Sequence, residues 1–169
     1  MKKLLLVFVA LIVAASFSNQ VVAQSNADSD AYATLIIPIS IVNDVAMDFK
    51  TLAASGTAGT CVMAATSGAA LTPTGGVTVI SGTPTAGKFT VTGEGTQVFT
   101  ITLPASASTL TGSVSGDMTV DTWTCSEPLT TAALVGGTLE FYVGGTLNVD
   151  ADEVAGLYSG TFNVIVDYN

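Results

Sequence analysis

The densest cluster of side chains able to do chemistry is acidic and lies near the C-terminal end. Asp150, Asp152 and Glu153 are almost consecutive, and carboxylate oxygens are preferred ligands of Ca²⁺. An EF-hand would also need a glycine at its sharp turn and a distal glutamate, and this segment has neither. We therefore favour a solvated acidic turn and retain the three residues as calcium candidates.

Paired carboxylates can also hydrolyse a glycosidic bond. Asp117 with Asp121, and Asp150 with Glu153, are close in sequence, but no motif fixes the carboxylate separation on which that reaction depends. The chain contains no histidine and no arginine, which most acid–base and phosphate-handling sites require. We predict a protein that is not an enzyme and that binds no cofactor.

The N-terminus has the pattern of a secretory signal peptide. Lys2 and Lys3 precede an apolar run over residues 4–15, and the small residue Ala23 precedes Gln24. The apolar run is too short to span a bilayer. We expect cleavage after Ala23, which leaves residues 24–169 as one domain without a transmembrane helix, secreted, periplasmic or at the cell surface.

The two cysteines, Cys61 and Cys125, would then enter an oxidising compartment, which favours a disulfide between them. A zinc site would need four ligands and the chain has no histidine. Trp123 lies two positions before Cys125, and a tryptophan packed on a disulfide is common in sandwich cores. We favour that role over a sugar-stacking platform.

Charge argues against two classes of partner. After signal cleavage two lysines face thirteen acidic residues, a net charge of −11. Nucleic acids and anionic lipids both require a basic patch on the protein. We therefore expect neither as a partner.

Period-two alternation of apolar and polar residues predicts strands along most of the mature chain. The glycine pair Gly144-Gly145 predicts a hairpin turn, Pro38 predicts an edge or bulged first strand, and residues 128–136 are compatible with a helical turn. The predicted strands cover residues 34–42, 45–50, 77–80, 89–92, 98–103, 118–124, 138–143, 146–149 and 157–168.

Many short strands separated by turn residues indicate an all-β protein. We predict an immunoglobulin-like or jelly-roll β-sandwich of about eight to nine strands. A small outer-membrane β-barrel is the alternative, which we disfavour because most strands are shorter than a bilayer crossing requires and the aromatic residues form no girdles.

Four segments carry a family resemblance. They are Phe89-Thr90-Val91-Thr92-Gly93, Phe99-Thr100-Ile101-Thr102-Leu103-Pro104, Phe141-Tyr142-Val143-Gly144-Gly145-Thr146-Leu147 and Gly156-Leu157-Tyr158-Ser159-Gly160-Thr161-Phe162. In this order, over residues 33–169, the chain resembles the bacterial secreted proteins of domain of unknown function 4402. The opening strand pair, residues 33–39 and Met47-Asp48-Phe49, also fits, although the family usually continues with glycine where this chain has Lys50.

More distantly, the chain is similar to spore coat U and archaic chaperone-usher pilin domains. That resemblance implies an incomplete immunoglobulin-like sandwich that a strand from a neighbouring subunit could complete. The N-terminal arm expected here, residues 24–30, is short and polar. It does not predict that mode of assembly.

Two classes of function follow from these observations. The first is an exported structural or adhesive subunit of a cell surface or fibre, associating with itself or with other surface proteins. The alternative is an extracellular carbohydrate- or calcium-binding module that uses the loops at residues 116–121 and 150–156.

Overall fold

The structure is a computed structural model that describes residues 24–169, so the predicted signal peptide and its cleavage site lie outside the described residues. Residues 35–169 form a compact unit whose regular structure is all β. The described part of the chain contains no helix long and apolar enough to cross a membrane.

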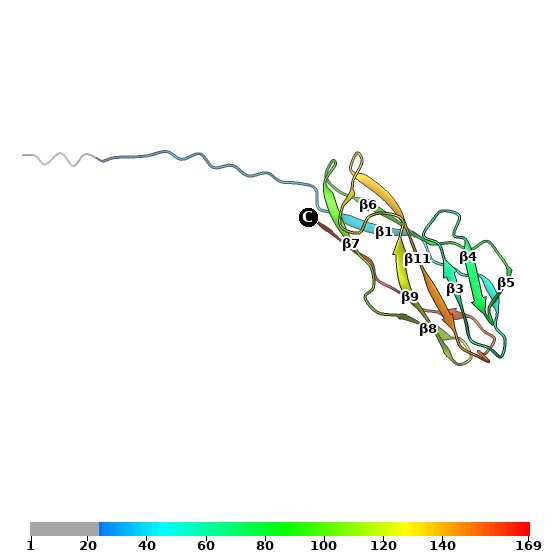
Figure 1. The fold of residues 1–169 in the computed structure, drawn as a ribbon. Helices are drawn as coiled ribbons and strands as arrows, with labels where there is room; N and C mark the ends of the chain where they lie inside the picture. The colour runs from blue at the N-terminus through cyan, green and yellow to red at the C-terminus, as the bar shows by residue number, and fades with distance from the viewer. Residues whose placement is uncertain (1–23) are drawn as a thin grey trace, which may run out of the picture. The chain divides into compact units, whose positions relative to one another are not determined.

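Thirteen short strands follow one another between residues 24 and 169 (Figure 1). They are β1 (Ser40–Val45), β2 (Thr51–Ala53), β3 (Gly59–Met63), β4 (Leu71–Gly75), β5 (Thr78–Ser81), β6 (Gly87–Thr92), β7 (Val98–Thr102), β8 (Ser108–Gly112), β9 (Asp117–Cys125), β10 (Ala132–Ala133), β11 (Thr138–Val149), β12 (Tyr158–Ser159) and β13 (Ile165–Tyr168).

The largest sheet is built around β11. Its strand order is β1-β6-β11-β9-β8-β12, and β3 joins β11 to β4. The first half of β11 pairs with β6, where Phe141 faces Phe89, and the second half pairs with β3, where Leu147 faces Cys61. On its other side β11 pairs with β9. All of these pairings are antiparallel.

Two smaller sheets, β10-β7-β13 and β2-β5, accompany the large one. One core cluster joins Phe99 and Ile101 of β7 to Phe89 of β6 and Phe141 of β11, so the two sheets pack face to face. The Phe89 and Phe141 rings stack with centroids 5.5 Å apart. This arrangement is consistent with the predicted β-sandwich.

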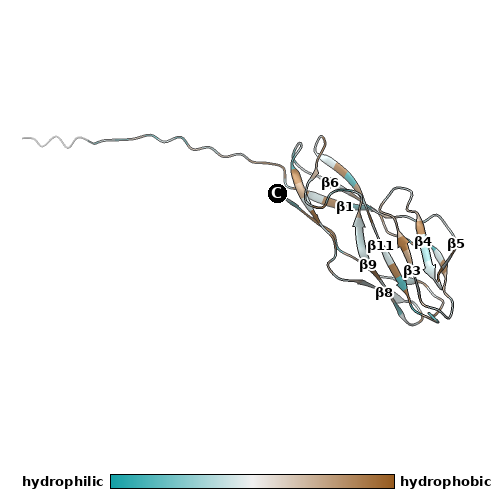
Figure 2. Cartoon of the chain, in the orientation of Figure 1, coloured by the Kyte–Doolittle hydropathy of each residue, from teal (hydrophilic) through white to brown (hydrophobic). Residues whose placement is uncertain are grey.

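A second core cluster lies where β11 pairs with β3. Cys61 and Met63 of β3 pack with Val120 of β9 and Leu147 of β11, and Phe49 closes the cluster from the segment after β1. Figure 2 shows β3 and β7 coloured mainly as hydrophobic. The apolar side chains of these strands therefore form the inner faces of both sheets.

The predicted hairpin at Gly144-Gly145 is wrong, because both glycines lie inside the continuous strand β11. A Cβ atom on Gly144 would lie 2.3 Å from the Met63 carbonyl oxygen. These glycines therefore allow neighbouring backbones to approach closely, and the pairing with β9 shifts register between Gly144 and Thr146.

Other boundaries also differ from the prediction. The strand predicted at residues 45–50 is not formed, because β1 ends at Val45 and Asp48 makes only an isolated bridge. The closing strand is interrupted, because residues 160–164 belong to no strand between β12 and β13. Residues 128–136 contain a turn at residues 129–131, followed by the short strand β10. The first strand begins at Ser40, after Pro38, and β1 lies at the edge of its sheet as the proline predicted.

Candidate functional site

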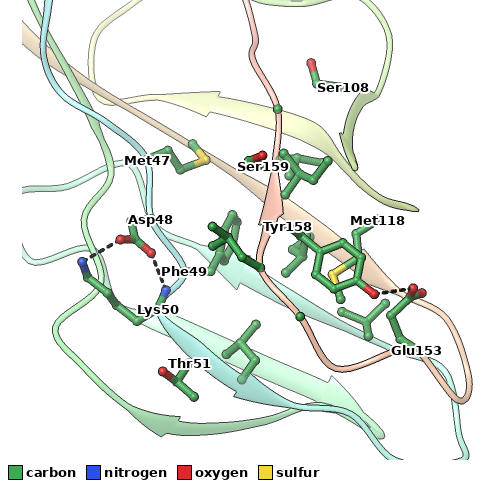
Figure 3. A pocket seen from close by; sticks show the side chains of 18 of the residues that line it. Met47, Asp48, Phe49, Lys50, Thr51, Ser108, Met118, Glu153, Tyr158 and Ser159 are labelled. Carbon is green, nitrogen blue, oxygen red and sulfur yellow. Dashed lines mark hydrogen bonds and ion pairs between the residues drawn. The ribbon is translucent and has the colours of Figure 1, made fainter. Parts of the chain in front are cut away.

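A groove of about 790 Å³ lies on the inner face of the large sheet (Figure 3). Residues 46–54 form one wall and residues 153–162 form the other. The floor is apolar and consists of Leu110 of β8, Met118 and Val120 of β9, and Leu147 and Val149 of β11. We call this feature the groove.

Both walls are segments in which the chain changes sheets. After β1 the chain leaves β6, makes an isolated bridge from Asp48 to Thr85, and enters β2, which pairs with β5. On the other side β12 pairs with β8, residues 160–164 cross over, and β13 pairs with β7. The groove lies between these two segments, at the points where the chain passes from one sheet to another.

Asp48 and Lys50 form a charged pair on the first wall. The Asp48 carboxylate accepts hydrogen bonds from the Lys50 backbone N at 2.7 Å and from Lys50 Nζ at 2.6 Å. Burial alone would raise the pKa of Asp48, but these hydrogen bonds and the ammonium charge outweigh it and hold the pKa below its ordinary value. Lys50 adopts φ of 59°, the left-handed region that favours glycine.

Tyr158 and Glu153 form a polar pair on the second wall, and Figure 3 shows the two side chains meeting. The Tyr158 hydroxyl donates to Glu153 Oε1 at 2.8 Å. Partial burial, that hydrogen bond and the Glu153 charge all raise the pKa of Tyr158, because each disfavours the phenolate. The groove is thus apolar below and polar at its rim.

The structure does not bring the calcium candidates together. Across residues 24–169 there is no group of three or more acidic or cysteine side chains placed to hold a metal ion. Glu153 is engaged by Tyr158, and the backbone N of Asp152 donates to the Ser55 carbonyl oxygen at 3.4 Å. Asp150 is exposed in the turn after β11. These residues form a charged turn beside the groove.

The predicted Cys61–Cys125 disulfide is not formed, and both cysteines are free thiols. Cys61 of β3 faces Leu147, whereas Cys125 of β9 faces Val143, so β11 lies between the two cysteine-bearing strands. Two strand spacings amount to about 10 Å, beyond the Cα separation of ~7 Å that a disulfide can bridge. Burial raises the pKa of both thiols.

Trp123 is half-buried, and the disulfide on which we expected it to pack is not formed. It contacts both core clusters, and its ring centroid lies 4.6 Å from that of Phe162. The indole Nε1 donates to the Ser106 carbonyl oxygen at 3.3 Å. Trp123 also lines the groove, so its indole is placed to report on what occupies it.

Sequence reasoning did not single out the residues that build the groove. In the sequence, Phe49, Met118 and Tyr158 have the pattern of ordinary strand residues. Only the fold brings them together in the groove. Two of the segments that carry the family resemblance, Met47-Asp48-Phe49 and residues 156–162, turn out to supply its opposite walls. The only sequence signal that pointed to the groove was therefore that both walls belong to segments of the family resemblance.

Comparison with protein families gives a match to the domain of unknown function DUF4402 over residues 39–168. No curated protein and no solved structure matches the chain. The family match includes both walls and the floor of the groove. The chain therefore belongs to the DUF4402 family.

Proposed function

We propose that this chain is an exported structural subunit of a cell surface or fibre that associates with copies of itself. The observation that carries the proposal is the exposure of large apolar side chains outside the two cores. In the N-terminal segment Tyr32 and Leu35 are 90% and 92% exposed. Apolar side chains that cluster on a surface mark sites of protein contact.

A second apolar group lies at the loops beside the groove and consists of Val114, Val154 and Leu157, all exposed. The backbone N of Ser113 donates to the Leu157 carbonyl oxygen at 2.7 Å, and the Leu157 backbone N donates to Ser113 Oγ at 3.1 Å. These bonds hold the two loops together with their apolar side chains outward. A fixed apolar group of this kind favours a protein partner.

Strand edges offer a further contact surface. Within residues 24–169, β1 pairs only with β6 and β13 only with β7. An unpaired strand edge presents backbone N–H and C=O groups to which another chain can add a strand. Edge pairing and apolar contact together support self-association.

The proposal is tested by locating the native protein. Antibody labelling in electron microscopy, combined with blots of secreted and surface fractions, should place it on the cell surface in ordered assemblies. A deletion strain is the matched control for the label. A protein found only as a free monomer in the medium, or retained in the cytoplasm, would contradict the proposal.

The groove favours a second candidate, a carbohydrate-binding module. Trp123 and Tyr158 supply aromatic surface, and Asp48 and Glu153 supply carboxylates at the rim. Concave sites with aromatic walls and a few polar groups are typical of small-ligand sites. On a glycan array the wild type should bind, and the Tyr158→Ala variant should not. Binding that requires calcium would be lost when a chelator is added, and an array silent in both conditions would remove this candidate.

A further inference from the structure

We propose that the groove binds the apolar chain of one single-chain lipid whose head group carries an ammonium. This inference goes beyond the proposed function, because neither self-association nor sugar binding requires such a ligand. Three features of the groove support it. They are the inward placement of Trp123, the aliphatic floor that lies between two polar pairs, and the acidic rim.

A β-bulge in β9 turns Trp123 toward the interior. Two residues of β9, Thr122 and Trp123, lie opposite the single residue Gly145 of β11, which is the pattern of a bulge. Val120 before the bulge and Trp123 after it both pack inward, although regular alternation would put them on opposite faces. Thr122 adopts φ of 49°, an outlier for a β-branched residue. Bulges and strained backbone of this kind occur beside functional sites, where they redirect a side chain.

The surroundings of Trp123 leave its apolar surface for a ligand. A Cβ atom on Gly145 would lie 3.2 Å from Trp123 Cε3, so the glycine makes room for the indole. On the wall, the Phe162 ring centroid lies 4.6 Å from that of Trp123. The indole Nε1 already donates to the Ser106 carbonyl oxygen. What the indole offers the groove is therefore apolar contact, which an alkyl chain uses more fully than a sugar does.

The floor of the groove lies between two polar pairs. Its side chains are aliphatic apart from one methionine, and aliphatic groups offer a sugar hydroxyl no hydrogen-bond partner. Figure 3 shows the Asp48–Lys50 pair and the Tyr158–Glu153 pair on opposite sides of the apolar side chains. The volume of about 790 Å³ falls within the range of about 300–1,000 Å³ that small-molecule sites have. An apolar chain can cover this floor while its head group stays at the rim.

The rim favours a cationic head group. Lys50 Nζ lies 2.6 Å from Asp48, and Lys88 Nζ lies 2.8 Å from Glu140. These are the only lysines of residues 24–169, so Glu153 has no lysine partner in the described chain, and the hydroxyl that donates to it is neutral. The same residues carry a net charge of −11. That field attracts an ammonium and repels a sulfate or phosphate head group.

The experiment titrates residues 24–169, the chain expected after signal cleavage, with probes that share one chain and differ in the head group. The probes are dodecyltrimethylammonium, dodecyl maltoside and dodecyl sulfate, all below the concentrations at which they form micelles. Tetramethylammonium supplies the head group without a chain.

Two readouts follow binding, the fluorescence of Trp123, which is the single tryptophan of the chain, and isothermal titration calorimetry. We expect one ammonium amphiphile to bind per protein chain, about tenfold more tightly than the sulfate. Dodecyl maltoside should bind with intermediate affinity, and tetramethylammonium should not bind. The preference for the ammonium head group should shrink as the salt concentration rises.

Two pairs of variants locate the site. Glu153→Gln should weaken binding of the ammonium amphiphile about fivefold, the size expected for a partly exposed ion pair. Asp167→Asn on β13 removes the same charge outside the groove and should leave the affinity unchanged. Ser108→Phe fills the groove from β8 and should prevent binding of every dodecyl probe, whereas Thr72→Phe, on the exposed edge strand β4, should not. Circular dichroism establishes that each variant is folded.

Three results would overturn the inference. Equal affinity for the three dodecyl probes would show that the rim does not distinguish the charge of the head group. Tetramethylammonium bound as tightly as the amphiphile would show that the floor contributes nothing. Unchanged binding by a folded Ser108→Phe protein would place the ligand outside the groove. A chain that forms surface assemblies but binds no probe would overturn this inference alone and leave the proposed function standing.

Discussion

The Tyr168 hydroxyl donates a hydrogen bond to the Ile37 carbonyl oxygen at 2.9 Å, across 131 positions of the sequence. The same hydroxyl accepts a hydrogen bond from the Glu94 backbone N at 2.6 Å. One phenol therefore ties the end of β13 both to the turn between β6 and β7 and to the segment that precedes β1. Gly93 makes room for it, because a Cβ atom there would lie 2.1 Å from the hydroxyl oxygen.

Tyr168→Phe should lower the free energy of unfolding by about 1–2 kcal/mol, because it removes two hydrogen bonds and leaves the ring in place. Hydrogen exchange at Ile37 and the residues before it should also become faster. Urea denaturation and exchange mass spectrometry measure the two effects. Tyr32→Phe is the control, since Tyr32 is 90% exposed, and it should change neither. Equal stability of Tyr168→Phe and the wild type would show that water replaces both bonds at no cost.

Lys50 offers a test of backbone strain at the position where the DUF4402 resemblance led us to expect glycine. Its φ is 59°, a conformation that costs a residue with a Cβ atom about 1–2 kcal/mol. Lys50→Gly should therefore be more stable than Lys50→Ala by about 1 kcal/mol, after allowance for the greater chain entropy of glycine. Both variants lose the ion pair with Asp48, so their difference isolates the backbone. Thermal unfolding of the two proteins decides it, and a more stable alanine variant would contradict the argument.

Asp48 should give the stability of the protein a defined pH dependence. Its folded pKa is lowered because the Lys50 hydrogen bonds and charge outweigh the effect of burial. Such a carboxyl group stabilises the fold above the unfolded pKa of about 3.9, and the contribution is lost as pH falls through the folded pKa. The wild type should thus exceed Asp48→Asn in urea stability at pH 6, and the difference should disappear at pH 2. The pair is partly exposed, with side-chain exposures of 35% and 48%, so salt should reduce the difference at pH 6.

Gly144 tests the close approach of β11 and β3. Gly144→Ala would place a methyl group against the Met63 carbonyl oxygen, and overpacking of this kind costs about 1–3 kcal/mol. Gly68 has no atom within 4 Å of its Cβ position, so Gly68→Ala should be neutral or slightly stabilising. Denaturant unfolding of both variants compares them directly. A Gly144→Ala protein as stable as the Gly68→Ala protein would mean that the two strands separate readily.

The two free thiols should differ in reactivity. Cys61 has no exposed surface and Cys125 is half-buried, so a thiol reagent should modify Cys125 first and Cys61 only when the fold opens. Cys125→Ser should remove the fast phase and leave the slow one. Non-reducing mass spectrometry of the secreted protein should find both thiol hydrogens present. A mass that lacks them would show that the exported chain pairs its cysteines in another arrangement.

Local patterns predicted the strands that form most of the first core cluster. The segments predicted at residues 89–92, 98–103 and 118–124 correspond to β6, β7 and β9, because alternation of apolar side chains is a property of neighbouring residues. β2, β3, β4, β8 and β10 were missed. They lie among glycine, threonine and serine residues, and β4 includes Pro73, which an edge strand tolerates. β3 pairs with β4, and β8 with β9, as neighbours along the chain, whereas the pairing of β3 with β11 joins strands distant in sequence.

Gly144-Gly145 shows where local chemistry misleads. A glycine pair between two apolar runs has the composition of a hairpin turn, yet here it permits close contact between β11 and its neighbours. The cysteines show the same limit, since an even count in an exported chain says nothing about the strand that separates them. In both cases the deciding contact is between segments far apart in the chain.

Side-chain alternation and turn composition were enough to predict an all-β protein and the edge position of the segment that follows Pro38. The residues of particular segments carried the resemblance to the family that the comparison then showed. Tertiary structure alone decided that residues 46–54 and 153–162 face each other across a groove and that residues 31–36 belong to no strand. The physical reason is that alternation records which face of a strand is buried, whereas strand order and sheet crossing depend on the packing of the whole chain.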